Sequence, residues 1–142
     1  MSAYTIADIT TALATTIKAN VFSPIYTYEL PTALGQFPAA CVEPVAANFE
    51  LNMGGPNATD VWEFLVYVVV NGNNFDTAKA QLGRYCSGSG PDSIREIIFN
   101  HRDLGLQDVE AFVYGMHGYG GSFPWFNTHH LGAALLVRVY IN

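Results

Sequence analysis

The stretch VWEFLVYVVVN, from Val61 to Asn71, is the strongest strand pattern in the chain. Successive side chains of a strand point to opposite faces of a sheet. One face of this strand would be wholly apolar, and the other would carry Glu63 among apolar and aromatic residues. A strand that is apolar on both sides is central in its sheet or is covered by a neighbour. We therefore expect Val61–Asn71 to be an inner strand.

Four more strand patterns surround it. Pro44 lies inside one of them, and because proline cannot donate to a ladder, it argues for an edge position or a bulge there. In the last pattern every second residue from Leu131 to Ile141 is apolar, which gives one buried face. These four predicted strands are Tyr26–Tyr28, Ala39–Phe49, Val109–His117 and Leu131–Ile141.

Three helices are predicted between the strands. The first follows Thr5, which can cap it while Asp8 bonds back, with Tyr4 and Ile9 as an apolar staple, and it should end near Asn20. The second is capped by Asp76 and buries Ala78, Leu82 and Tyr85, and the third runs from about Pro91 to Asn100 and buries Ile94, Ile97 and Ile98.

The order of elements is therefore α-β-β-β-α-α-β-β. We expect a single domain over residues 1–142 in the α+β class, with a mostly antiparallel mixed sheet of about five strands and helices packed on one face.

Composition narrows the function. Six Lys and Arg against twelve Asp and Glu give a net charge of −6, which is a poor footprint for binding nucleic acid. Charged residues make up only 13% of the chain, as in small domains that cover part of their surface with partners.

The sequence shows no targeting or membrane-spanning segment. The N-terminus has no secretion-signal pattern, and the longest apolar run, Phe64–Val70, is too short to span a bilayer. Cys41 and Cys86 need not pair, so we expect reduced thiols in a cytosolic product.

The stretch RYCSGSGPDSIREII, Arg84 to Ile98, raises the question of a phosphate or nucleophile site. It lacks the lysine of a phosphate-binding loop, and its Gly-Ser-Gly lies between two helices instead of after a strand. A turn explains every residue: Gly88 would end one helix with a positive φ, and Pro91 and Asp92 would begin the next. We expect a structural corner in which Ser89 has no catalytic role.

The histidines and carboxylates of the chain give only weak signals of a metal or catalytic site. His129 and His130 are adjacent and would point to opposite faces of a strand, and neither they nor His117 shows a metal-binding spacing. His101 is expected to cap a helix end or be solvated. Four carboxylates flank the Leu51–Thr59 loop and are interpreted as solvated strand-end groups: Glu43, Glu50, Asp60 and Glu63. We predict no catalytic residue, no cofactor and no metal.

The loop GYGGSFPWFN, Gly118 to Asn127, holds Phe123, Trp125 and Phe126 beside a proline and glycines. These aromatics either fold back over the sheet edge or form an anchor for a partner, because aromatic residues dominate interface energetics. Both interpretations stay open at this point.

The order of these segments resembles the tail terminator proteins of long-tailed phages with non-contractile tails, especially those of actinobacterial phages. The resemblance covers nearly the whole chain. Its most specific part is the helix, Gly-Ser-Gly corner and helix of DTAKAQLGRYCSGSGPDSIREII. The other matching segments are IADITTALATTI, IYTYELP, NFELNMGGPNATDVWEFLVYVVVN with its Met-Gly pair, and LGAALLVRVYIN.

The resemblance implies a virion structural protein, not an enzyme. It implies a homohexameric ring that caps the tail tube, stops polymerisation of the major tail tube protein and presents a surface to the head-completion or connector protein. DNA would pass through without specific binding, and the ring would sit at the head-proximal end of the tail after assembly in the host cytoplasm. The Gly118–Asn127 loop is longer and more aromatic than in that family. The expected partner contacts are Met53, Gly54, Gly55, Phe123, Trp125 and Phe126. The alternatives are another phage neck or connector protein and a small-ligand or enzymatic α+β domain.

Overall fold

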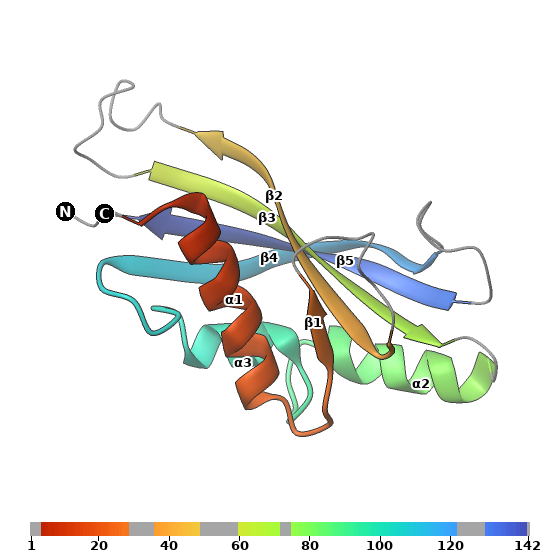
Figure 1. Cartoon of the computed structure of the whole chain (residues 1–142). Coiled ribbons are helices and arrows are strands. Elements are labelled where there is room, and N and C mark those ends of the chain that lie inside the picture. The colour runs from red at the N-terminus through yellow and green to blue at the C-terminus, as the bar shows by residue number, and fades with distance from the viewer. Residues whose placement is uncertain (1–3, 29–35, 49–59, 72–74, 122–129, 142) are drawn as a thin grey trace.

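The computed structural model describes residues 4–28, 36–48, 60–71, 75–121 and 130–141. One mixed five-stranded sheet carries three helices, all on one face, in the expected order α-β-β-β-α-α-β-β (Figure 1). The predicted α+β class is therefore confirmed. The elements are α1 (Ile6–Asn20), β1 (Tyr26–Tyr28), β2 (Ala39–Asn48), β3 (Asp60–Asn71), α2 (Phe75–Cys86), α3 (Ile94–Asn100), β4 (Val109–Gly121) and β5 (His130–Ile141).

The described strands lie in the order β1-β2-β3-β5-β4, so β3 is central, as its two apolar sides predict. β3 and β5 pair antiparallel over their whole length, from Asp60 opposite Ile141 to Asn71 opposite His130. β1 and β2 are parallel, and the other pairs are antiparallel. The short parallel β1 makes the sheet mixed, as predicted.

Pro44 occupies the kind of position that a strand proline requires. The register between β2 and β3 shifts between Pro44 and Ala46, which marks a bulge. β1 pairs with β2 only over Ala39–Cys41, so within the described residues the rest of β2 is an outer edge. Both expectations for Pro44 are confirmed.

The core lies between the sheet and the helices. Every second residue of β3 faces the helices, and Phe64 in its middle is only 1% exposed. α1 contributes Ile9, Leu13 and Ile17 to this core, and their helical spacing places all three on one side of the helix. α2 and α3 contribute the residues predicted for them, namely Ala78, Leu82, Tyr85, Ile94 and Ile98, with Ile97 also buried.

The helix starts were predicted with mixed success. Thr5 and Asp8 form the expected capping box, with Thr5 N donating to Asp8 Oδ2 at 2.9 Å and Asp8 N donating to Thr5 Oγ1 at 3.2 Å. α2 begins at Phe75, so Asp76 lies in its first turn and is not its cap. α3 begins at Ile94 with Ser93 as N-cap, not at Pro91. Ser93 Oγ accepts from Glu96 N at 3.2 Å, which is why the helix starts later than expected.

Asp92 does not face the start of α3 but is drawn inward, where it is 5% exposed. Its two carboxylate oxygens accept from Ser23 N at 2.6 Å and from Ser23 Oγ at 2.9 Å. Arg84 Nε lies 3.6 Å from Asp92 Oδ2. Tyr85 Oη donates to the carbonyls of Pro24 at 3.1 Å and Ser23 at 3.2 Å, and burial raises the pKa of Tyr85 to about 12, so it remains a donor. This group, the Asp92 clamp, ties the segment after α1 to the corner between α2 and α3.

The prediction of a positive φ at Gly88 is wrong: within this corner the positive φ, +119°, is at Gly90. Gly88 has a different role, since a Cβ there would lie 3.2 Å from Arg95 Nη1. The turn is held by Ser93 Oγ, which donates to Ser87 O, and by Glu96 Oε2, which accepts from Gly90 N at 3.0 Å. The corner is a structural turn, but its left-handed residue lies two positions later than expected.

Replacing Gly90 with valine is expected to lower the free energy of unfolding by about 1–2 kcal/mol, because a Cβ is strained at this φ even in open space. Ser89→Ala should leave it nearly unchanged, since Ser89 is exposed. Thermal unfolding of both variants measures this difference. Equal shifts in melting temperature would contradict it, and loss of a hydrolytic activity in Ser89→Ala would contradict a purely structural corner.

Candidate interaction surface

The six partner contacts expected from the sequence, Met53, Gly54, Gly55, Phe123, Trp125 and Phe126, lie outside the described residues. The strand that leads toward the second group is described. β4 continues to Gly121 and not only to His117, because pairing resumes with Gly121 opposite Gly132. Gly118 and Gly120 both have positive φ values, 68° and 78°, which allow the irregular course between His117 and Gly121. The first four residues of the predicted Gly118–Asn127 loop therefore belong to the strand.

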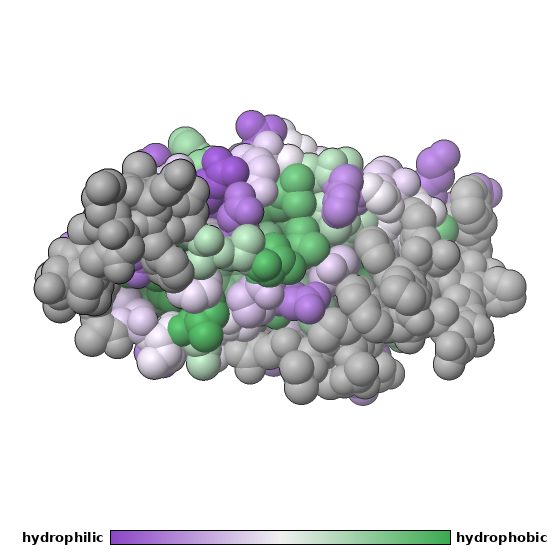
Figure 2. Space-filling view, turned by 90° about the horizontal axis from the view of Figure 1, so that it is seen from above, coloured by the Kyte–Doolittle hydropathy of each residue, from purple (hydrophilic) through white to green (hydrophobic). Residues whose placement is uncertain are grey.

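The described residues show a second apolar surface on the side of the sheet that no helix covers. We call it the helix-free face (Figure 1). Leu65 of β3 lies directly opposite Leu136 of β5, and both are partly exposed. Figure 2 shows hydrophobic side chains gathered in the middle of this side of the molecule. A small apolar cluster lies under the face, made of Cys41, Tyr67 and Ala134 with Tyr28 and Leu65 packed against it.

An aromatic strip continues the helix-free face across β5 and β4. The rings of Phe112 and Tyr140 are stacked, with centroids 5.9 Å apart and an interplanar angle of 12°. Tyr114 contacts Phe112 edge to face at 6.5 Å and is 42% exposed. Stacked and edge-to-face rings present a large and rigid contact area. The aromatic strip is formed by residues of β4 and β5, and no pattern in the sequence identified it in advance.

Two charges on this face, Arg138 and Glu63, neutralise each other, while Glu43, opposite Leu65, lies on the same face. Arg138 Nη2 lies 2.9 Å from Glu63 Oε1, and the two residues are directly opposite across β3 and β5. Tyr114 Oη also donates to Glu63 Oε1 at 3.3 Å, and the guanidinium of Arg138 lies 4.3 Å from the centre of the Tyr114 ring. The hydrogen bond to Glu63 raises the pKa of Arg138, which keeps the guanidinium protonated. Glu63 is therefore a paired group within the sheet, and its interpretation as a solvated strand-end group is wrong.

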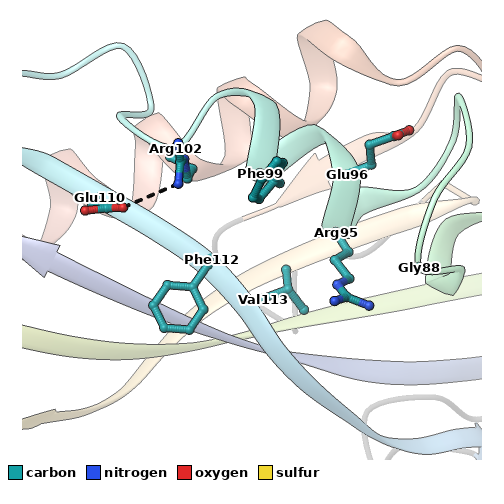
Figure 3. Close-up of a pocket in the computed structure, with 8 residues that line it drawn as sticks. All are labelled: Gly88, Arg95, Glu96, Phe99, Arg102, Glu110, Phe112 and Val113. Atoms are coloured by element: carbon teal, nitrogen blue, oxygen red, sulfur yellow. Dashed lines mark ion pairs between the residues drawn. The ribbon is translucent and has the colours of Figure 1, made fainter.

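A pocket of about 540 Å³ lies beside the outer edge of β4, between that strand and α3 (Figure 3). Phe99 and Arg95 of α3 and Phe112 and Val113 of β4 line it. Arg102 closes one end through an ion pair with Glu110 at 3.7 Å. Phe112 belongs both to this pocket and to the aromatic strip, so the two surfaces meet at β4.

The two cysteines are placed unfavourably for nucleophilic chemistry. Cys41 and Cys86 are free cysteines, and burial raises the pKa of each thiol to about 12, so both are protonated at neutral pH. Within the described ranges, no three His, Cys, Asp or Glu residues are grouped so as to hold a metal ion. His101 caps α3 through its backbone N–H, as expected for a helix end. Among the helices that the structure describes, none is long and apolar enough to cross a membrane.

No protein-family model matches the chain, and no curated protein sequence matches it. The surfaces described above therefore carry the functional argument.

Proposed function

We propose that the chain is a structural protein of a phage virion. In this proposal six copies form a ring that caps the tube of a non-contractile tail, stops polymerisation of the tail tube protein and joins the tail to the head-connector protein. The ring sits at the head-proximal end of the tail and is assembled in the host cytoplasm. The chain acts without catalysis and without a cofactor.

The observation that supports this proposal most strongly is the helix-free face. When one face of an antiparallel sheet is in contact with water, that face is commonly polar. Here that side carries Leu65, Leu136 and an aromatic strip, and the ion pair between Arg138 and Glu63 is internal to the sheet. A broad, largely apolar face with rigid aromatic residues suits contact with other subunits. By the resemblance to tail terminators, those subunits would be other copies of the chain, the tail tube protein and the head-connector protein.

The net charge of −6 supports the same assignment. A ring through which DNA slides must not hold its phosphates, and few cations are present to do so. Arg84, Arg102 and Arg138 are moreover engaged with carboxylates. Free basic residues on the described surface are therefore scarce.

Deleting the gene in the phage that encodes the chain tests the proposal. Loss of a tail terminator should give overlong tails that are not attached to heads, because nothing stops the tube. Electron micrographs of the lysate distinguish this result from its competitors. Tails of normal length without heads would indicate a connector protein instead, and normal virions would contradict a structural role.

Trp125→Ala is expected to leave the domain folded and to weaken its contact with the tube end, since truncating a buried aromatic anchor costs about 2 kcal/mol or more. Circular dichroism measures folding, and micrographs of phage assembled with the variant should show overlong or unattached tails. Normal tails joined to heads would reject Trp125 as an anchor. An unfolded variant would assign Trp125 to the core, as in the alternative interpretation of its loop.

A further inference from the structure

Within the part of the chain that the structure describes, the pocket between α3 and β4 contains a cation without an ion-pair partner. The chain has six Lys and Arg residues in all, and two of them, Arg95 and Arg102, line this pocket. Arg102 is paired with Glu110, and the carboxylate of Glu96 accepts from Gly90 N. Arg95 forms no ion pair with any described residue.

The fold also withdraws from Arg95 the acidic residue one helical turn before it. Asp92 lies three residues earlier, a spacing that favours ion pairs on a helix. It precedes the first turn of α3, however, and both its oxygens are turned inward to Ser23 and Arg84. Gly88 leaves room for the guanidinium of Arg95, since a Cβ there would approach Nη1 to 3.2 Å. The arginine is thus held beside the pocket while its local partner is used elsewhere.

The other walls of the pocket suit a peptide segment. Phe99 is 59% exposed, which leaves an apolar surface next to Arg95. Within the described residues β4 is the last strand of the sheet on this side. Ala111 N points outward and donates to Arg102 O at 2.7 Å, and Val113 follows two residues later in the same register. The backbone amide and carbonyl of Val113 therefore also face outward, along the pocket.

We propose that this pocket is the receiving half of a head-to-tail contact between copies of the chain, and that Arg95 binds a carboxylate on a segment of the neighbouring copy. This inference rests on the proposed ring. A copy is a suitable donor because it carries twelve Asp and Glu residues against six cations. The contact combines a charge-assisted hydrogen bond to Arg95 with apolar contact on Phe99.

Charge also bears on the symmetry of the contact. A two-fold contact with its axis beside Arg95 would place Arg95 of one copy against Arg95 of the other, which is unfavourable. A head-to-tail contact avoids this because the receiving and donating surfaces differ. The opposite edge of the sheet, formed by β1 and β2, exposes Tyr26 and Val45 and supplies such a different surface. Head-to-tail contacts generate closed rings when the rotation between copies closes.

Arg95→Glu tests the contact in the full-length protein by native mass spectrometry and light scattering. The wild type should form a closed oligomer larger than a dimer, and Arg95→Glu should weaken association by about 30-fold or more, the lower range for losing one partner of a desolvated charge pair. Because Arg95 is exposed, the variant should keep its melting temperature. Lys79→Glu is the matched control: it makes the same charge change at an exposed position of α2 and should leave the oligomer intact.

Phe99→Ala gives an independent measurement on the same pocket and should also weaken association without unfolding the domain. Equal association of the wild type and Arg95→Glu would overturn the pocket contact and leave the ring proposal standing. A wild type that stays monomeric up to its solubility limit, or that stops at a dimer, would overturn the inference as well. The gene-deletion experiment would then still test the proposed function separately.

Discussion

Asp92→Ala is expected to lower the free energy of unfolding by about 3 kcal/mol, and the melting temperature by about 10 °C for a chain of this length. The carboxylate is 5% exposed and accepts two hydrogen bonds from Ser23. Its removal leaves the Ser23 amide and hydroxyl without these acceptors in a partly buried place, and such groups are costly to leave unpaired. Arg84 loses its counter-charge in the same step.

Two variants make this result specific to the clamp. Asp76→Ala removes the same charge from an exposed position in the first turn of α2, so it should cost no more than about 1 kcal/mol. Asp92→Asn keeps one acceptor oxygen and should fall between the two. Urea unfolding of the three variants gives the free energies. If Asp92→Ala were no more harmful than Asp76→Ala, the clamp would contribute nothing to stability.

The elements of this fold were predictable because their patterns are local. The two apolar sides of Val61–Asn71 placed β3 at the centre, and Thr5 with Asp8 marked the start of α1. Ser93 and Glu96 have the same three-residue spacing as a capping box, and this signal would have placed the start of α3 correctly. Pro91 and Asp92 were preferred as a start because both residue types are common in the first turn of a helix.

The Asp92 clamp was not predictable, because Ser23 and Asp92 are 69 residues apart and nothing local links them. The same is true of Glu63, which finds Arg138 across the sheet, 75 residues away. Arg95 is the clearest case. Its sequence neighbour Asp92 suggests a pair, and only the three-dimensional structure shows that Asp92 is bound elsewhere. That Arg95 has no ion pair with a described residue is thus partly a consequence of the clamp.

The same substitution at two adjacent positions of β3 should separate stability from assembly. Phe64 faces the helices and is 1% exposed, whereas Leu65 lies on the helix-free face and is partly exposed. Phe64→Lys removes a core ring, which alone costs about 3–5 kcal/mol, and buries a charge in its place. Because the total stability of such a domain is about 5–15 kcal/mol, we expect this variant to be largely unfolded.

Leu65→Lys should instead cost about 1 kcal/mol, because the lysine stem can lie along the face while its ammonium group reaches water. The variant should therefore give a folded circular dichroism spectrum. If the helix-free face is covered by other subunits in the virion, that ammonium group must be desolvated on assembly, which is strongly unfavourable without a partner. Phage whose only supply of this protein is the Leu65→Lys variant should then yield few virions with tails joined to heads, although their lysates contain soluble, folded protein. Full complementation by Leu65→Lys would show that this face stays in water, and the apolar surface around Leu65 and Leu136 would need another explanation.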